Sequence, residues 1–273
     1  MTGLSRRVAA SPLATPAAVL FRVRRAAGHL RREVRNVSRW VITSREHSNY
    51  TYELTTVNLQ QLAWWVAAVA NVPVHEARGY IHEIQNDEEL FAHIEHFTRI
   101  SPRWRLADRE VRLHKRIGWY ALLRALKPEH VVETGTEKGL GTVVIAAALR
   151  RNGRGHVTTI DTNPDSGYLI QGFYQPFVDR KIGDSLSVLR SMDESVGVFL
   201  HDSLHTPEHE AQEFNAVSPL LSETAVVLSD YAHASAALPN WAEQHGRSYL
   251  FFAERPQGHW FPGEGIGAAF ARR

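Results

Sequence analysis

The chain of 273 residues contains no cysteine. This absence excludes disulfide bonds, thiolate nucleophiles and cysteine-ligated zinc. It is consistent with a reducing compartment, and we expect a cytoplasmic location. Long apolar runs are also lacking, because the longest, at 62–74, is well short of the roughly 20 residues needed to cross a bilayer. The composition is otherwise that of a globular protein, with 44% hydrophobic and 22% charged residues.

The net charge of +2 is small but very unevenly distributed. Residues 1–40 hold nine arginines and one acid, Glu33, which is +8, so the remainder carries +2 minus +8, or −6. We interpret residues 1–50 as a basic N-terminal arm, loosely packed, with an amphipathic helix at 17–25. Peripheral contact with an acidic surface and organellar targeting are the alternatives for this arm.

Residues 51–112 have a helical pattern. Apolar side chains recur at helical spacing before Pro73, and further helices are expected at 75–85, 87–97 and 108–126. We interpret this region as a lid over a site or as an oligomerisation surface, and a homo-oligomer is one expectation for the assembly.

Residues 113–273 alternate short apolar runs with helical segments. The runs lie at 130–134, 156–161, 178–182, 196–202, 224–230, 247–253 and 265–271. Alternation of this kind predicts an α/β domain with a Rossmann-like, seven-stranded sheet that is mostly parallel. Only a loop separates the last two runs, so we expect the last strand to be antiparallel.

A glycine-rich motif follows the first predicted strand and opens a helix. Its order, Glu133-x-Gly135-x-x-x-Gly139-x-Gly141, differs from the Gly-x-Gly-x-x-Gly of dinucleotide sites. An acid just before the first glycine suits a cationic amino-acid cofactor better than a pyrophosphate. A dinucleotide-dependent oxidoreductase is therefore a disfavoured alternative.

The motif resembles motif I of class I S-adenosylmethionine-dependent methyltransferases, and the resemblance covers roughly 113–273. It implies S-adenosylmethionine as cofactor. Asp161, at the end of the second strand, would take the ribose hydroxyls, and Asp184 after the third strand would lie against the adenine. The residues implied to bind the cofactor are Glu133, Gly135, Thr136, Glu137, Gly139, Gly141, Asp161, Asp184 and Asp202.

Two further acids end the fourth and fifth predicted strands. Asp202 and Asp230 should meet in one cleft, since parallel strands end at the same edge, and paired carboxylates suit Mg²⁺. The step from Asp202 to His205 resembles metal-dependent sugar and natural-product O-methyltransferases of the macrocin and cephalosporin type. That resemblance implies that Asp202 and Asp230 bind the metal, while His205 removes the proton of the acceptor hydroxyl.

One departure from that pattern keeps alternatives open. Relatives often carry an extra ligand beside the second acid, whereas here Ser229 and Tyr231 flank Asp230. The favoured function is O-methylation of a hydroxyl on a sugar, glycolipid or secondary metabolite, assisted by Mg²⁺. The alternatives are a metal-independent methyltransferase acting on nitrogen or a phenol, and a non-catalytic binding module. No clear nucleic-acid partner is expected, since the arm lacks interleaved aromatic residues.

Overall fold

The structure, a computed structural model, describes residues 14–46, 50–107 and 110–271. It divides into two compact units, residues 1–44 with 258–260, and residues 45–257 with 261–273. The first contains one long helix, α2 (Ala14–Thr43), where only 17–25 was expected to be helical. The rest of the predicted arm at 1–13 and 47–49 lies outside the described residues. Among the helices that the structure describes, none combines the length and apolar character needed to span a bilayer.

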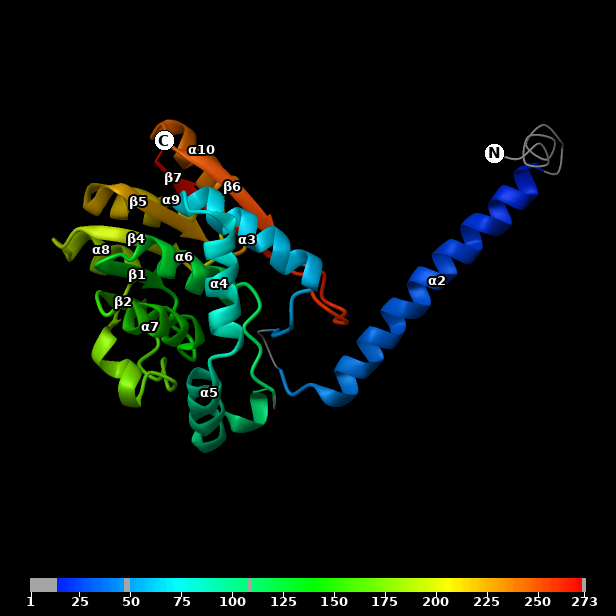
Figure 1. The fold of residues 1–273 in the computed structure, drawn as a ribbon, viewed down its shortest axis with the longest axis horizontal. Coiled ribbons are helices and arrows are strands. Elements are labelled where there is room, and N and C mark those ends of the chain that lie inside the picture. The colour runs from blue at the N-terminus through cyan, green and yellow to red at the C-terminus, as the bar shows by residue number, and fades with distance from the viewer. Residues whose placement is uncertain (1–13, 47–49, 108–109, 272–273) are drawn as a thin grey trace. The chain divides into compact units, whose positions relative to one another are not determined.

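The second unit is built on a seven-stranded sheet (Figure 1). Its order is β3-β2-β1-β4-β5-β7-β6, where β1 to β5 pair in parallel and β7 is antiparallel to both β5 and β6. The predicted fold class, including the reversed last strand, is confirmed. The strands are β1 (His130–Thr134), β2 (His156–Asp161), β3 (Val178–Ile182), β4 (Val196–His201), β5 (Leu221–Ser229), β6 (Ser248–Ala253) and β7 (Gly265–Phe270).

Alternating side chains of the central strands enter two hydrophobic cores. Val131 and Val198 point to the larger core, while Val132 and Phe199 point to the smaller one. This is the two-residue period of a strand that is covered on both faces. The smaller core is completed by α8 (Ser185–Ser191), α9 (Pro207–Val217) and α10 (Ala237–Gln244).

The larger core is completed by helices that precede and follow β1. These are α3 (Thr56–Ala70), α4 (Val74–Gln85), α5 (Glu88–Ile100), α6 (Arg116–Leu126) and α7 (Leu140–Asn152). The helices of 51–112 thus share one compact unit with the sheet. Short 3₁₀ turns lie at η1 (Trp104–Leu106), η2 (Gly172–Phe177) and η3 (Ser218–Leu220).

The helix expected over 108–126 begins only at Arg116. Asp108, where it was expected to start, lies outside the described residues. His114 adopts φ +37°, and an α-helix cannot continue through a left-handed residue. Residues 114–116, which form a turn and the first residue of α6, line a cavity at the carboxyl edge of the sheet.

Candidate active site

The glycine turn joins β1 to α7 and brings the chain against the end of β4. Gly135 has φ +91°, and a Cβ atom there would lie 2.0 Å from the Asp202 carbonyl oxygen. Gly139 has φ +87°, with Ile170 3.0 Å from the corresponding Cβ position. Only glycine tolerates both the backbone angle and this close approach. The glycine turn therefore brings the start of α7 close to the loop that follows β4.

Asp161 holds this turn in place. One of its carboxylate oxygens accepts hydrogen bonds from the backbone N–H groups of Thr136 at 3.0 Å and Glu137 at 2.8 Å. Its other oxygen accepts from Asn163 N–H at 2.8 Å. The oxygen that accepts from Asn163 retains a second lone pair. Asp161 thus lies at the predicted strand end, but its described partners belong to the protein backbone, and its role toward ribose stays a prediction.

Glu133 lies beneath α7 and does not line the cavity. It accepts hydrogen bonds from the hydroxyls of Thr142 at 2.5 Å and Thr159 at 2.7 Å. Burial raises its pKa to about 7. Gly141 leaves room for this side chain, since a Cβ there would lie 2.5 Å from Glu133 Oε1. Glu133 is therefore held by two threonines beneath α7, and its contact with a cofactor stays a prediction.

Asp184 caps a helix rather than facing the cavity. Its carboxylate accepts a hydrogen bond from Ser187 N–H at 2.8 Å at the start of α8. Hydrogen bonds from Ser187 lower the pKa of Asp184. Its predicted contact with adenine stays a prediction, because the side chain lies beside β3 outside the cavity lining.

A cavity of about 430 Å³ lies at the carboxyl ends of β1, β4 and β5. The glycine turn, the strand ends and the segments before α6 and β7 all contribute to it. Its lining is Tyr50, His114, Lys115, Arg116, Gly135, Thr136, Glu137, Leu140, Gly141, Asp202, Ser203, His205, Asp230, Tyr231, Phe261 and Glu264. The two sequence motifs, one glycine-rich and one acidic, thus open into the same space.

Asp202, His205 and Asp230 come together in this cavity. Their donor atoms lie within 4.8 Å of one another, and His205 Nε2 is 3.9 Å from Asp202 Oδ1. Burial and the neighbouring Asp230 raise the pKa of Asp202 well above its usual range. Asp230 Oδ1 is buried and meets no N–H donor among the described residues, and the carboxyl groups of Asp230 and Asp202 interact. The three side chains are therefore close enough together to bind a proton or a small cation between them.

Lys115 is the residue that the sequence analysis missed. Its Nζ lies 2.5 Å from Asp230 Oδ2 and also bonds Glu264, and it is only 5% exposed. Burial disfavours the charged forms of both Asp230 and Lys115. Lys115 nevertheless lowers the pKa of Asp230, and the surrounding carboxylates raise the pKa of Lys115. No local pattern marks this lysine, because its partners lie 115 and 149 residues away. The site thus contains its own fixed cation.

His205 is oriented by an aromatic neighbour. The ring of Tyr231 stacks on it at 5.2 Å between centroids, and Tyr231 itself has φ +58°. A bulky residue with a left-handed backbone is strained, and such strain concentrates at functional sites. Burial lowers the pKa of His205, so its imidazole is neutral at neutral pH and able to accept a proton.

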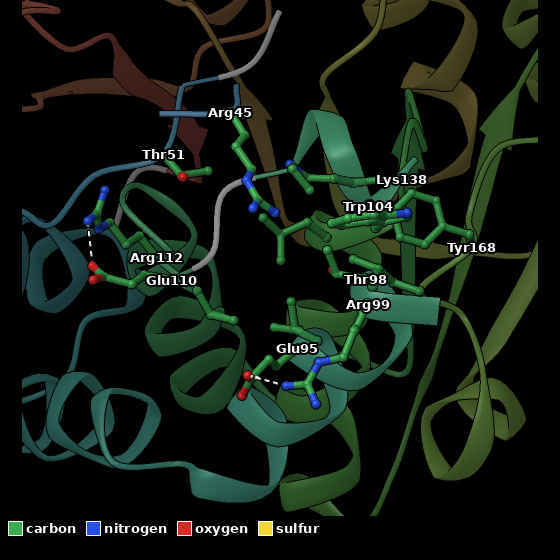
Figure 2. Close-up of a pocket in the computed structure, with 15 residues that line it drawn as sticks. Arg45, Thr51, Glu95, Thr98, Arg99, Trp104, Glu110, Arg112, Lys138 and Tyr168 are labelled. Atoms are coloured by element: carbon green, nitrogen blue, oxygen red, sulfur yellow. Dashed lines mark hydrogen bonds and ion pairs between the residues drawn. The ribbon is translucent and has the colours of Figure 1, made fainter. Parts of the chain in front are cut away.

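A second cavity of about 270 Å³ lies between α5, η1 and the start of α7 (Figure 2). Leu140 lines both cavities, so the two are neighbours. Cationic and aromatic side chains surround the second one, and the guanidinium of Arg45 lies 5.5 Å from the Trp104 ring. Its acids are each paired within the lining, Glu95 with Arg99 and Glu110 with Arg112, both at 2.5 Å.

Comparison with known proteins agrees with this architecture. Residues 132–231, which include the glycine turn and the ends of β4 and β5, match the family model described as "Methyltransferase domain". The chain contains a methyltransferase domain. No curated protein matches the sequence of the chain.

Two solved structures share the fold of this methyltransferase. The O-methyltransferase TomG of Streptomyces achromogenes, involved in tomaymycin synthesis and solved with S-adenosylmethionine, is 17% identical. The match covers 69% of this chain and 92% of TomG, with a TM-score of 0.50. A methyltransferase from Geobacter sulfurreducens is 15% identical over 66% of this chain and 90% of its own, with a TM-score of 0.51. The prediction of a methyltransferase is confirmed.

A buried acid of the methyltransferase domain explains why His201 points away from the cavity. His201 Nδ1 lies 2.7 Å from Glu213 Oε2, which also accepts from Thr134 at 2.7 Å, while Glu213 Oε1 accepts from Ser203 at 2.8 Å. Although burial by itself would raise the pKa of Glu213, His201 and the hydroxyls of Ser185 and Thr134 lower it to about 2. This cluster ties α9 to β1 and β4, so His201 faces the helix layer as the strand alternation predicts.

Proposed function

We propose that this methyltransferase uses S-adenosylmethionine to methylate a hydroxyl group of a small-molecule acceptor. The observation that carries the proposal is that the glycine turn and the group Asp202, His205 and Asp230 line one cavity. A cofactor held at the turn would present its methyl group to an acceptor held at the strand ends. The description of TomG as an O-methyltransferase in complex with S-adenosylmethionine is consistent with this assignment.

The cofactor part of the proposal concerns the glycine turn and Asp161. Titration calorimetry with S-adenosylhomocysteine should give a dissociation constant in about the micromolar range. Asp161→Ala should weaken binding about tenfold or more, because it removes the turn's hydrogen bonds and any contact with ribose. The matched control is Asp165→Ala, an exposed acid of the same loop. Equal binding by both variants would contradict the role of Asp161, and no binding by the unaltered chain would contradict the cofactor.

The proposed chemistry is an in-line displacement at the sulfonium methyl group. The acceptor oxygen forms a bond to the methyl carbon as the sulfur–carbon bond breaks, which leaves S-adenosylhomocysteine. His205, neutral because burial lowers its pKa, receives the proton of the hydroxyl. Most of the acceleration would come from alignment of the two reactants in the cavity.

We include a divalent cation, Mg²⁺, in the proposal. Asp202 and Asp230 would hold it, since their donor atoms and that of His205 fit around one ion. It would supply a positive charge that polarises the acceptor hydroxyl. To bind there, the ion must displace the proton favoured by the raised pKa of Asp202.

A metal-independent methyltransferase is the second candidate, favoured by the ion pair of Lys115 and Asp230. Lys115 already brings a positive charge to the site, which the metal would otherwise supply. Activity measured after EDTA treatment separates the two candidates. Loss of activity with recovery on addition of Mg²⁺ would support the metal, whereas full activity in EDTA would contradict it and favour Lys115.

For the acceptor we propose a hydroxylated sugar, glycolipid or secondary metabolite that also carries an anionic group. The second cavity supports the added detail, because Trp104, Tyr168 and arginines surround a space next to the first cavity (Figure 2). Aromatic faces suit a ring, and guanidinium groups suit a carboxylate or phosphate. Trp104→Ala should raise KM about tenfold with kcat nearly unchanged, unlike the exposed control Trp64→Ala. An unchanged KM would remove this cavity from acceptor binding.

A further inference from the structure

The helix α2 has an exposed apolar surface. It spans 30 residues, none of which is buried. At 1.5 Å per residue it is about 45 Å long. Large apolar side chains are among its most exposed residues, namely Val19, Leu20, Phe21, Val23, Leu30, Val34, Val37, Val41 and Ile42. Exposed apolar surface on this scale marks an interaction site.

The apolar side chains of α2 form one continuous stripe. They follow one another at alternating spacings of three and four residues at Leu20, Val23, Ala27, Leu30, Val34, Val37 and Val41. At 3.6 residues per turn, this spacing confines them to an arc of roughly 100°. The stripe runs through six turns without a charged side chain, so it presents a single apolar face along most of the helix.

The rest of the circumference of α2 is strongly basic. Residues 14–43 contain seven arginines (Arg22, Arg24, Arg25, Arg31, Arg32, Arg35 and Arg39) and one acid, Glu33, which is a net charge of +6. Arg25, Arg32 and Arg39 lie seven residues apart and therefore share one side of the helix, away from the apolar stripe. A partner complementary to this helix is therefore apolar where it meets the stripe and anionic where it meets the arginines.

From this pattern we propose that α2 lies in the plane of an anionic lipid membrane. The stripe would enter the boundary between head groups and acyl chains, and the arginines would contact the anionic head groups. A second copy of the helix fits less well. Two copies packed along the stripe would bring together two charges of +6, with only Glu33 available for complementary pairing.

The test is co-sedimentation of the full chain with vesicles of phosphatidylcholine containing about one-third phosphatidylglycerol. We expect binding at an ionic strength of about 0.01 M, much weaker binding at about 0.5 M, and little binding to pure phosphatidylcholine. Arg25→Gln/Arg32→Gln/Arg39→Gln should lower the partition coefficient on the order of 100-fold, at about fivefold per arginine.

A second variant tests the apolar stripe without changing the charge. Val23→Ser/Leu30→Ser/Val37→Ser should lower partition at least about tenfold, while circular dichroism shows that the body stays folded. The control is the exposed arginine of the body in Arg154→Gln, which should bind vesicles like the unaltered chain. Absence of binding to anionic vesicles at low ionic strength would overturn the proposal. So would a salt-insensitive dimer that the serine variant converts to a monomer, because the stripe would then belong to a second copy.

Discussion

At the scale of single residues, the cavity is organised by buried charges that balance one another. Asp202, Asp230 and Glu264 all interact electrostatically with Lys115, and these groups shift one another's pKa. A buried carboxylate is tolerated when a cation lies within bonding distance, and otherwise it retains its proton. The structure contains both environments side by side, since Lys115 lowers the pKa of Asp230, whereas burial and Asp230 raise the pKa of Asp202.

The variant Lys115→Met tests this balance. It should lower the free energy of unfolding by about 3 kcal/mol, because Asp230 and Glu264 lose their buried counter-charge. Urea denaturation at neutral pH measures the loss. In the double variant Lys115→Met/Asp230→Asn, much of it should be recovered. Strictly additive losses would mean that the two side chains do not stabilise each other.

His205 should determine how activity depends on pH. Burial lowers its pKa below the ordinary value of 6.5, so the neutral base is present at neutral pH and is lost only on the acid side. His205→Ala should lower kcat about 100-fold and remove the acid limb, with the affinity for S-adenosylhomocysteine unchanged. The control His75→Ala, at an exposed histidine, should keep the kcat and the acid limb of the unaltered chain. An acid limb that persists in His205→Ala would assign the base to another group.

Glu133 should make the fold less stable as pH rises. Its pKa is raised from 4.5 in the unfolded chain to about 7, so its contribution is full below pH 4.5 and is lost as pH rises through about 7. Glu133→Gln can keep the two threonine hydrogen bonds without the charge. Above pH 7 we expect this variant to be more stable than the unaltered chain, by about 2 kcal/mol. Parallel stability curves for the two proteins between about pH 4 and pH 8 would contradict this expectation.

At the scale of elements, the turn between β1 and α7 is constrained from two sides. Its position depends on Gly135, which touches the backbone of Asp202, and on Asp161, which holds two of its N–H groups. The same contacts fix where the chain leaves β4. A change in this turn should therefore disturb the cofactor side and the acidic side of the cavity together.

Two alanine substitutions, one in this turn and one at the far end of α7, separate backbone strain from close packing. Both Gly135 and Gly153 have positive φ, but only Gly135 has atoms near the Cβ position. Gly153→Ala should cost about 1 kcal/mol of unfolding free energy, from strain alone. Gly135→Ala should cost about 3 kcal/mol or more and abolish cofactor binding, as thermal unfolding and calorimetry would show. Equal losses would mean that the β4 backbone moves away at little cost.

At the scale of the whole molecule, the chain consists of a folded body and a unit built on α2. Because no residue of α2 is buried, removal of residues 1–44 should change the unfolding temperature by less than about 2 °C. Binding of S-adenosylhomocysteine should also be kept. A drop in unfolding temperature of about 5 °C or more would show instead that this region supports the folded body.

Much of the body could be predicted from local patterns. The seven predicted runs became the seven strands. The inner strands β1, β2 and β4 were the easiest to predict, because strands of a parallel sheet that is covered on both faces are apolar on both faces. The start of α6 could not be predicted, because its apolar pattern continues upstream while the left-handed His114 interrupts the helix. The length of α2 was also underestimated, since only 17–25 was expected to be helical.

The sequence by itself determined the fold class and the placing of Glu133, Asp161, Asp184, Asp202 and Asp230 at or just after the carboxyl ends of successive strands. These are consequences of short-range periodicity and of glycines at a turn, which are visible within a few residues. Only the tertiary structure decided what each acid contacts. It turned Glu133 toward Thr142 and Thr159, made Asp184 a helix cap, and paired Asp230 with a lysine 115 residues away. Pairing of buried charges depends on which strand ends meet in space, and no local pattern encodes it.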